Sequence, residues 1–166
     1  QDCGKAGVVA LAGGKKPGKV FLLRADMDAL PMAEESGEEF ASDNGYMHAC
    51  GHDLHTTMLL GAARILKEYE EEIEGTVKLM FQPAEEIGKG ALAMIAEGAM
   101  EGVDAVFGQH IWAGVESGKI SIEAGPRMAS AAQYEIKVQG KGGHGAMPAE
   151  CIDAVTCSCA IVNSMQ

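Results

Sequence analysis

The chain has 166 residues, 47% hydrophobic and 22% charged, which suits one compact core or part of a larger domain. Its formal net charge of −11 argues against nucleic acid or an anionic membrane as a partner, because both favour clustered Lys and Arg, so a small soluble substrate is expected. No apolar run approaches the ~20 residues of a membrane span, and five cysteines without framework spacing favour the cytoplasm.

The first 112 residues alternate between strand-like and helix-like patterns. Apolar runs at 7–13 and 19–28, separated by GGKKPG, predict two strands joined by a turn in a hairpin-like start. Apolar residues at helical spacing predict a helix over 55–73, and a strand, a helix and a strand are expected at 75–86, 90–100 and 103–112. This alternation predicts an α/β fold, a largely parallel sheet with flanking helices.

The pattern changes from about Gly118. Residues 118–124 and 131–140 alternate like half-buried antiparallel strands, and 152–165 reads as a helix. Cys151, just before this helix, and Cys157 and Cys159, within it, are expected to be buried. A second domain is therefore predicted to open near residues 124–130. The chain begins without Met and ends inside a helical pattern, so we expect it to be a piece of a longer protein.

Acidic and imidazole side chains follow three of the predicted strands. Asp26 and Asp28 end the second strand, Glu85 and Glu86 end the third, and His110 ends the fourth. Because ligands of open α/β sheets bind outside the carboxyl ends of the strands, we expect these groups to converge at one edge.

The segment HACGHDLH, residues 48–55, precedes a predicted helix and can reach the same edge. Cys50 and His52 add a thiolate and an imidazole to the carboxylates, a combination that suits Zn²⁺, with Mn²⁺, Co²⁺ or Ni²⁺ as alternatives, and that an all-oxygen Ca²⁺ or Mg²⁺ site would not use. Of two adjacent glutamates, one can bind metal while the other takes a proton from water. The pattern therefore favours a metal-dependent hydrolase.

Each element also has a structural interpretation when taken alone. A strand-end aspartate often caps a turn, paired glutamates after Pro often begin a helix, and His110 alone suits a hydrogen-bonded core position. One metal cannot use every imidazole nearby, so His48 and His55 stay open as structural residues. Only the coincidence of all of them at one edge favours the metal site.

Five motifs in this order, LRADMDALPM, HACGHDLHT, FQPAEE, GQHIW and GKGGHGAMP, resemble the M20 metallopeptidase family over nearly the whole chain. The similarity is greatest to its amidohydrolase branch, which includes N-acyl-amino-acid hydrolases, hippurate hydrolase, auxin-conjugate hydrolases and N-acetyl-diaminopimelate deacetylase. The resemblance implies a zinc-exopeptidase-like catalytic domain, of which residues 1–125 are a part. It also implies that residues 126–166 begin a smaller α+β lid and dimerisation domain.

The resemblance also implies roles for individual residues. Glu85 matches the general base, and Asp28 matches an aspartate that orients a ligand imidazole. Asp26 stands where many peptidase relatives have a metal-binding histidine, so it is not expected to be a ligand. His144, in GGHG, matches a lid histidine that reaches a partner subunit's site and stabilises the developing oxyanion. Four residues match the family's metal ligands: Cys50, His52, Glu86 and His110.

Two features depart from the family pattern. Ala149 follows GAMP where the family usually has a histidine, and the family's last metal ligand, a downstream histidine, lies beyond the end of this chain. The resulting hypothesis is hydrolysis of the amide bond of N-acyl amino acids at a centre of two divalent metal ions, in a homodimer formed through the lid. The alternatives are a dipeptidase or carboxypeptidase of the same family, and a metal-binding or dimer-forming module without catalysis.

Overall fold

The chain divides into two compact units, Gln1–Ile120 and Ser121–Gln166, and the computed structural model describes residues 6–165. Each unit is considered by itself. The first contains, in chain order, β1 (Val8–Gly13), β2 (Lys16–Asp26), α1 (His52–Glu68), the 3₁₀ turn η2 (Glu70–Glu72), β3 (Glu74–Gln82), α2 (Gly90–Ala96) and β4 (Ala105–Gly108). The second contains the 3₁₀ turn η3 (Pro148–Glu150) and α3 (Ala154–Ser164).

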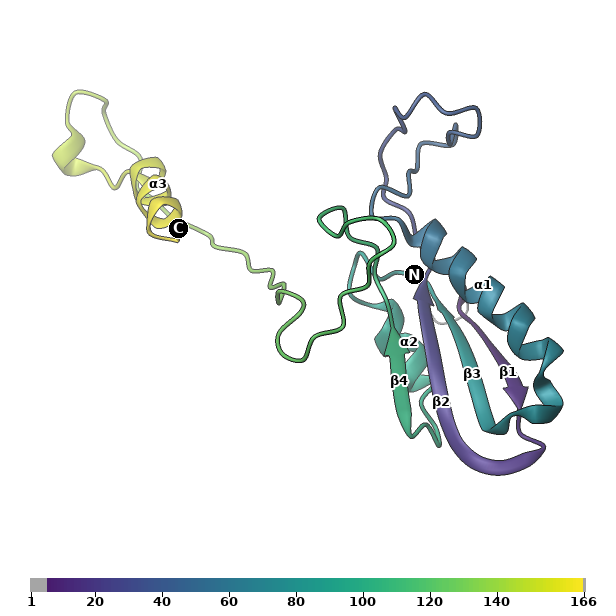
Figure 1. The fold of residues 1–166 in the computed structure, drawn as a ribbon. Coiled ribbons are helices and arrows are strands. Elements are labelled where there is room, and N and C mark those ends of the chain that lie inside the picture. The colour runs from purple at the N-terminus through teal and green to yellow at the C-terminus, as the bar shows by residue number, and fades with distance from the viewer. Residues whose placement is uncertain (1–5, 166) are drawn as a thin grey trace. The chain divides into compact units, whose positions relative to one another are not determined.

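The four strands form one sheet in the order β1-β3-β2-β4 (Figure 1). β2 is parallel to both β3 and β4, whereas β1 is antiparallel to β3. The predicted α/β fold with a largely parallel sheet is therefore confirmed. The predicted hairpin is wrong, because β3 lies between β1 and β2.

Glycines explain how the chain turns from β1 to β2 around the beginning of β3. Gly14 has a φ of 81° and its N–H donates to the Gly75 carbonyl at 2.7 Å, so the turn bonds to β3. Gly75 has a φ of 87°, and a Cβ there would lie 2.1 Å from the Lys19 carbonyl oxygen. The Gly-rich segment does mark a turn, but its close backbone contacts are made with a third strand that arrives much later in the sequence.

Apolar side chains leave both faces of the sheet, as alternation along a strand requires. α1 covers one face and α2 contributes to the other (Figure 1). The cluster on the α1 face consists of Ala25, Leu59, Leu79 and Phe81. The cluster on the α2 face consists of Leu22, Met80, Met94 and Ala99. Two helical layers thus hold β2 and β3 at the centre, and these strands carry the predicted acidic residues at their ends.

The second unit corrects two predictions. Its described residues contain no strand at 131–140, and 118–124 also has none; only an isolated bridge joins Lys141 to Ile152. A strand needs a neighbour for its N–H and C=O groups, and neither segment has one within the described chain. The cysteines predicted to be buried are partly exposed at Cys151 and exposed at Cys157 and Cys159.

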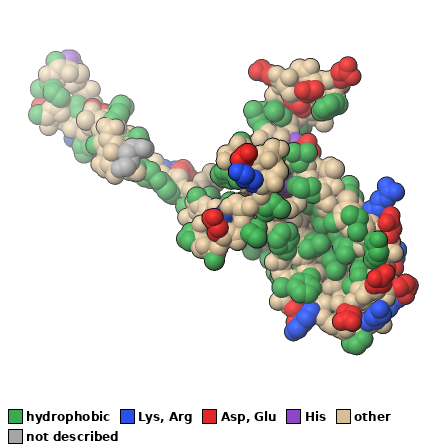
Figure 2. Space-filling model, viewed as in Figure 1, with side chains coloured by type: hydrophobic (Ala, Val, Ile, Leu, Met, Phe, Trp, Pro, Cys, Tyr) green, Lys and Arg blue, Asp and Glu red, His purple; other side chains and the backbone are tan. Residues whose placement is uncertain are grey.

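α3 begins at Ala154, two residues after the predicted start, because Asp153 caps it, accepting hydrogen bonds from the N–H groups of Val155 and Thr156 at 2.9 and 3.2 Å. None of its residues is buried within this unit, which is why its cysteines are accessible. Among the described residues, none of the helices has both the length and the apolar character that a membrane crossing requires. Figure 2 shows hydrophobic side chains on the visible surface of the first unit as well.

Candidate metal centre

The parallel strands bring their carboxyl ends to one edge of the sheet. Asp26 is the last residue of β2, Glu85 follows β3 by three residues, and His110 follows β4 by two. Because β2 pairs in parallel with both other strands, the predicted convergence of these groups is confirmed for the backbone.

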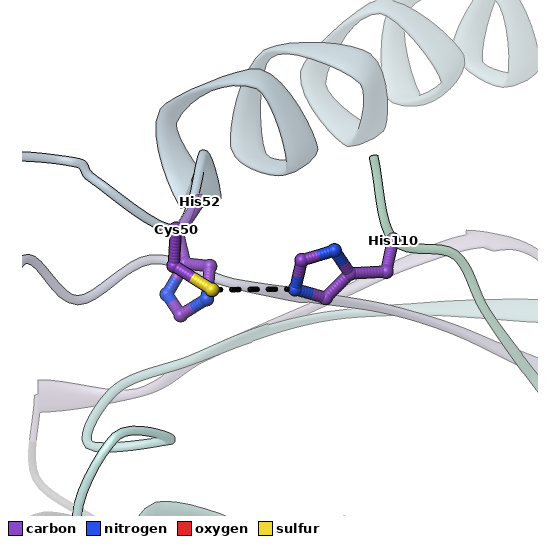
Figure 3. Close-up of side chains that lie close together, drawn as sticks. All are labelled: Cys50, His52 and His110. Carbon is purple, nitrogen blue, oxygen red and sulfur yellow. Dashed lines mark hydrogen bonds between the residues drawn. The ribbon is translucent and has the colours of Figure 1, made fainter. Parts of the chain in front are cut away.

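Cys50 and His52 enter this edge from the start of α1, and His110 enters from the end of β4 (Figure 3). Cys50 Sγ lies 3.4 Å from His110 Nε2. One donor atom from each of the three residues lies within 4.8 Å of the others, and His52, Glu85 and Glu86 form a second group of the same size. His52 belongs to both groups, so the donor atoms form one continuous set around its imidazole.

The hydrogen bonds of His52 fix its tautomer. Its Nδ1 faces two acceptors of Asp28, the carbonyl oxygen at 3.0 Å and the carboxylate Oδ1 at 3.3 Å, so Nδ1 carries the proton and donates. Nε2 therefore presents its lone pair. That atom is buried and has no hydrogen-bond partner among the described residues. Asp28 thus orients the ring in the way that a carboxylate orients a metal-bound imidazole.

Three carboxylates surround the Nε2 lone pair of His52 beyond hydrogen-bond distance. The separations are 3.7 Å to Asp26, 4.0 Å to Glu85 and 3.8 Å to Glu86. A lone pair enclosed by anionic oxygens is unfavourable unless a positive charge lies between them. Among the described residues, the one Lys or Arg paired with these three carboxylates is Arg24, on Asp26. The residues therefore fit a divalent metal ion with mixed N, O and S ligands.

His110 and Cys50 are also prepared as ligands. His110 Nδ1 donates to the Ile111 carbonyl oxygen at 2.5 Å, which leaves Nε2 as the atom that faces Cys50. Burial raises the pKa of the Cys50 thiol, and the neighbouring carboxylates raise it further, with Glu86 acting more strongly than Glu85. The anionic surroundings thus disfavour a bare thiolate, whereas a bound cation would favour one.

Strained backbone places the two glutamates. Ala84 has a φ of 54°, a left-handed conformation that is uncommon for a residue other than glycine, and its carbonyl accepts from Gly90 N–H at 3.1 Å. A Cβ on Gly90 would lie 1.5 Å from the Pro83 carbonyl oxygen, so only glycine allows α2 to begin there. Glu86 is also fixed by its N–H, which donates to Asp28 Oδ2 at 3.0 Å.

Asp26 was expected at this edge and His55 was left open as a structural residue, but the sequence did not indicate that the two form a pair. Both are 1% exposed, and Asp26 Oδ1 lies 2.5 Å from His55 Nδ1. Burial raises the pKa of Asp26, but the hydrogen bond from His55 and the charge of Arg24 outweigh it, so the net pKa lies below the usual value. One signal was available: His52 and His55 are three residues apart, a spacing that places them side by side on a helix.

Two further histidines lie outside this cluster. His48 is exposed, in the loop before α1. His144 belongs to the second unit, where its Nδ1 accepts a hydrogen bond from the Ala146 N–H at 3.1 Å. That bond makes the exposed Nε2 of a neutral His144 the protonated nitrogen, and hence a hydrogen-bond donor.

The backbone at Gly51 leaves no room for a side chain, which allows a test of the packing at the site. It precedes α1 with a φ of 86°, and a Cβ there would lie 2.2 Å from Ile111 Cδ1. We expect Gly51→Ala to lower the free energy of unfolding by at least about 1–2 kcal/mol, the cost of a left-handed L-residue, with the clash added. The matched control is Gly61→Ala inside α1, where a Cβ meets nothing within 4 Å and a gain of about 0.5–1 kcal/mol is expected. Urea titration measures both, and equal stabilities of the two variants would contradict this account.

The chain matches the family model described as peptidase family M20/M25/M40 over residues 22–163. It is 49% identical over 164 residues to an N-acyl-L-amino acid amidohydrolase of Geobacillus stearothermophilus, covering 98% of this chain and 44% of that protein. It is 50% identical over 161 residues to thermostable carboxypeptidase 2 of Saccharolobus solfataricus, covering 95% of this chain and 41% of that one.

A solved structure agrees with the sequence relatives. The Bacillus subtilis YXEP protein, described as a dinuclear metal binding peptidase from the M20 family, superposes with a TM-score of 0.60 at 48% identity. The match covers 63% of this chain and 30% of that one. This chain spans less than half the length of these relatives. The matched motifs, the sheet and the donor set together show that the chain belongs to the peptidase family M20/M25/M40.

Proposed function

We propose that the protein hydrolyses the amide bond of N-acyl amino acids and releases a carboxylic acid and an amino acid. The observation that carries the proposal is the buried Nε2 of His52, which has no partner among the described residues and is surrounded by three carboxylates. Such an arrangement suits a metal centre, and the amidohydrolase relative supports the choice of substrate.

In this proposal Cys50, His52, Glu86 and His110 hold the metal, and the dinuclear centre of the YXEP protein supports two ions rather than one. Zn²⁺, Mn²⁺, Co²⁺ and Ni²⁺ all suit a mixed thiolate, imidazole and carboxylate set. Glu86 is assigned as the ligand because it has the larger effect on the Cys50 thiol and its side chain is 24% exposed, whereas the side chain of Glu85 is 42% exposed and free to meet water.

When bound, the metal supplies a Lewis acid that polarises the acyl carbonyl and acidifies water. Glu85 takes a proton from the water as its oxygen attacks the acyl carbon, and delivers that proton to the nitrogen as the C–N bond breaks. Asp28 keeps the proton of His52 on Nδ1 throughout, so that Nε2 stays available. His144 offers its Nε2–H to the tetrahedral oxyanion, and the hydrogen bond from Ala146 supports this tautomer.

The proposal extends to the organisation of the whole protein. Residues 1–125 would form part of the catalytic domain and 126–166 would begin the lid. A homodimer formed through that lid would bring His144 to the partner's site. A cytoplasmic location is included, because the four described cysteines are all free thiols and Cys50 must remain reduced to serve as a ligand.

A panel of substrates tests the proposal on the whole protein. With Zn²⁺, Mn²⁺, Co²⁺ or Ni²⁺ added after chelation, N-acetyl and N-benzoyl amino acids should release free amino acid, detected with an amine-reactive dye.

A second candidate, a carboxypeptidase, is supported by the relative from Saccharolobus solfataricus. Cleavage of longer peptides with no turnover of N-acyl amino acids would favour it. Metal binding without turnover of either class would favour a module that only binds metal.

A further inference from the structure

We propose that Asp26 and His55 are positioning residues, which hold the segment bearing His110 against the metal centre and do not bind metal themselves. The inference rests on the proposed function, because it takes His110 as a ligand. It is carried by a chain of hydrogen bonds that runs from Arg24 through the buried pair of Asp26 and His55 to the backbone of Ile111.

The tautomer of His55 follows from its two partners. The backbone N–H of Ile111 donates to His55 Nε2 at 3.0 Å, so Nε2 is an acceptor and carries no proton. Nδ1 therefore carries the proton and donates to Asp26 Oδ1. Both ring nitrogens are thus engaged, and no lone pair of His55 remains for a metal unless Ile111 loses its bond.

Asp26 is occupied on both of its oxygens. Oδ1 accepts from His55, and Oδ2 accepts from the Arg24 guanidinium at 2.8 Å. Arg24 is itself held by Gln82, whose Oε1 accepts from the Arg24 Nε at 2.8 Å. Both carboxylate oxygens of Asp26 are thus fixed acceptors.

Ile111 connects this chain of bonds to the ligand. Its carbonyl accepts from His110 Nδ1, and its side chain fills the space next to Gly51, the residue between Cys50 and His52. The rings of His55 and His110 pack edge to face, with centroids 4.5 Å apart. A shift of the Ile111 amide therefore moves the imidazole that faces Cys50.

Asp26, His52 and His55 could also be taken as a metal-binding group, because one donor atom of each lies within 4.8 Å of the others. Their hydrogen bonds argue against it. Of the two imidazoles, only His52 has a nitrogen without a partner among the described residues, whereas both nitrogens of His55 are engaged, so the group lacks a third donor. Each oxygen of Asp26 already accepts one hydrogen bond. The two readings differ in what substitution of His55 should do to metal stoichiometry.

Three variants of the whole protein distinguish His55 as a positioning residue from His55 as a metal ligand. Each is titrated with Co²⁺, and binding is followed by visible absorption. His55→Leu should weaken cobalt binding by about 10–100-fold, the usual effect of losing a group that orients a ligand, with stoichiometry at saturation unchanged. His55→Gln should restore most of the affinity, because its Oε1 can accept from the Ile111 N–H. His48→Leu, in the exposed loop before α1, is the control and should bind as the unaltered protein does.

Asp26→Asn gives a second readout that needs no metal. An amide offers one oxygen, so it cannot accept from both His55 and Arg24 as the carboxylate does. Long-range ¹H–¹⁵N NMR of ¹⁵N-histidine-labelled protein should show the Nδ1–H tautomer of His55 in the unaltered protein. The variant should lose that signal or shift it to the Nε2–H form, and should bind cobalt as weakly as His55→Leu does.

The outcomes distinguish this inference from the proposed function. Loss of a whole equivalent of cobalt at saturation in both His55 variants would make His55 a ligand and overturn the inference alone. Unchanged affinity in His55→Leu, or an Nε2–H tautomer in the unaltered protein, would also overturn it. Failure of the unaltered protein to bind cobalt would instead overturn the proposed metal centre, and with it the role given to His55.

Discussion

Glu85→Gln should lower kcat by about 10²–10⁴-fold, the usual contribution of a general acid–base group, while bound metal stays at the level of the unaltered protein. Glutamine keeps the size of the side chain but cannot take a proton from water. The side chain of Glu85 is 42% exposed and 4.0 Å from His52 Nε2, so its replacement leaves the Cys50, His52 and His110 donors in place. Steady-state kinetics on an N-acyl amino acid and metal analysis by plasma mass spectrometry measure the two effects.

Glu86→Gln is the matched control, since it changes the adjacent residue by the same atoms. Glu86 is held by its N–H on Asp28 and its carboxylate acts on the Cys50 thiol, so this variant should lose metal together with activity. If Glu85→Gln lost the metal and Glu86→Gln kept it, the roles of the two residues would be exchanged. If both kept metal and activity, neither would have the proposed role.

The largely parallel sheet was predictable because strand-like and helix-like segments alternate along the chain, as they do in α/β folds. Apolar runs at 75–86 and 103–112 end in Glu85, Glu86 and His110, and the observed parallel pairing of β3, β2 and β4 confirms the fold class. The predicted helix began at residue 55, whereas α1 begins at His52. In a sequence, the start of a helix is signalled by a capping Ser, Thr, Asp or Asn. Here Gly51 precedes α1 in a left-handed conformation without any side-chain cap.

Long-range pairing was not predictable from local pattern. GGKKPG does mark a turn, yet β1 pairs with β3, which begins only at Glu74. Strand pairing depends on which segments meet, and alternation along one segment does not specify its partner. The same limit applies at 118–124 and 131–140, where alternating residues form no strand because no described neighbour supplies the ladder.

At the site, residue types indicated the donors, and the family resemblance indicated Asp28 as the residue that orients His52, but the pairing of Asp26 with His55 was missed. Thiolate, imidazole and carboxylate side chains stand out in a sequence, so Cys50, His52 and His110 were identified before their clustering was known. The tautomers were not accessible, because they depend on backbone groups such as the Asp28 carbonyl and the Ile111 N–H. Every residue carries such backbone groups, so the sequence does not show which of them meets a given ring nitrogen. Only the fold reveals which nitrogen of each ring is free.

Cys50→Ser should abolish tight stoichiometric metal binding and remove the thiolate-to-cobalt charge-transfer band from the absorption of the Co²⁺-loaded whole protein. A serine hydroxyl is a harder and far less acidic ligand than a thiol, and it does not ionise beside Glu86, Glu85 and Asp26. His52 and His110 would remain, but the group of three donors would be reduced to two imidazoles. Metal analysis under reducing conditions gives the stoichiometry, and the spectrum identifies sulfur as a ligand.

Cys157→Ser is the control, because that thiol lies exposed on α3 in the second unit. It should keep both the metal and the charge-transfer band. A band that survives Cys50→Ser but disappears in Cys157→Ser would place the sulfur ligand elsewhere and remove Cys50 from the centre. Retention of metal without a band in both the unaltered protein and Cys50→Ser would mean that the carboxylates and His52 suffice. The buried lone pair of His52 would then still account for the metal, while the thiol 3.4 Å from His110 would be left with a structural role.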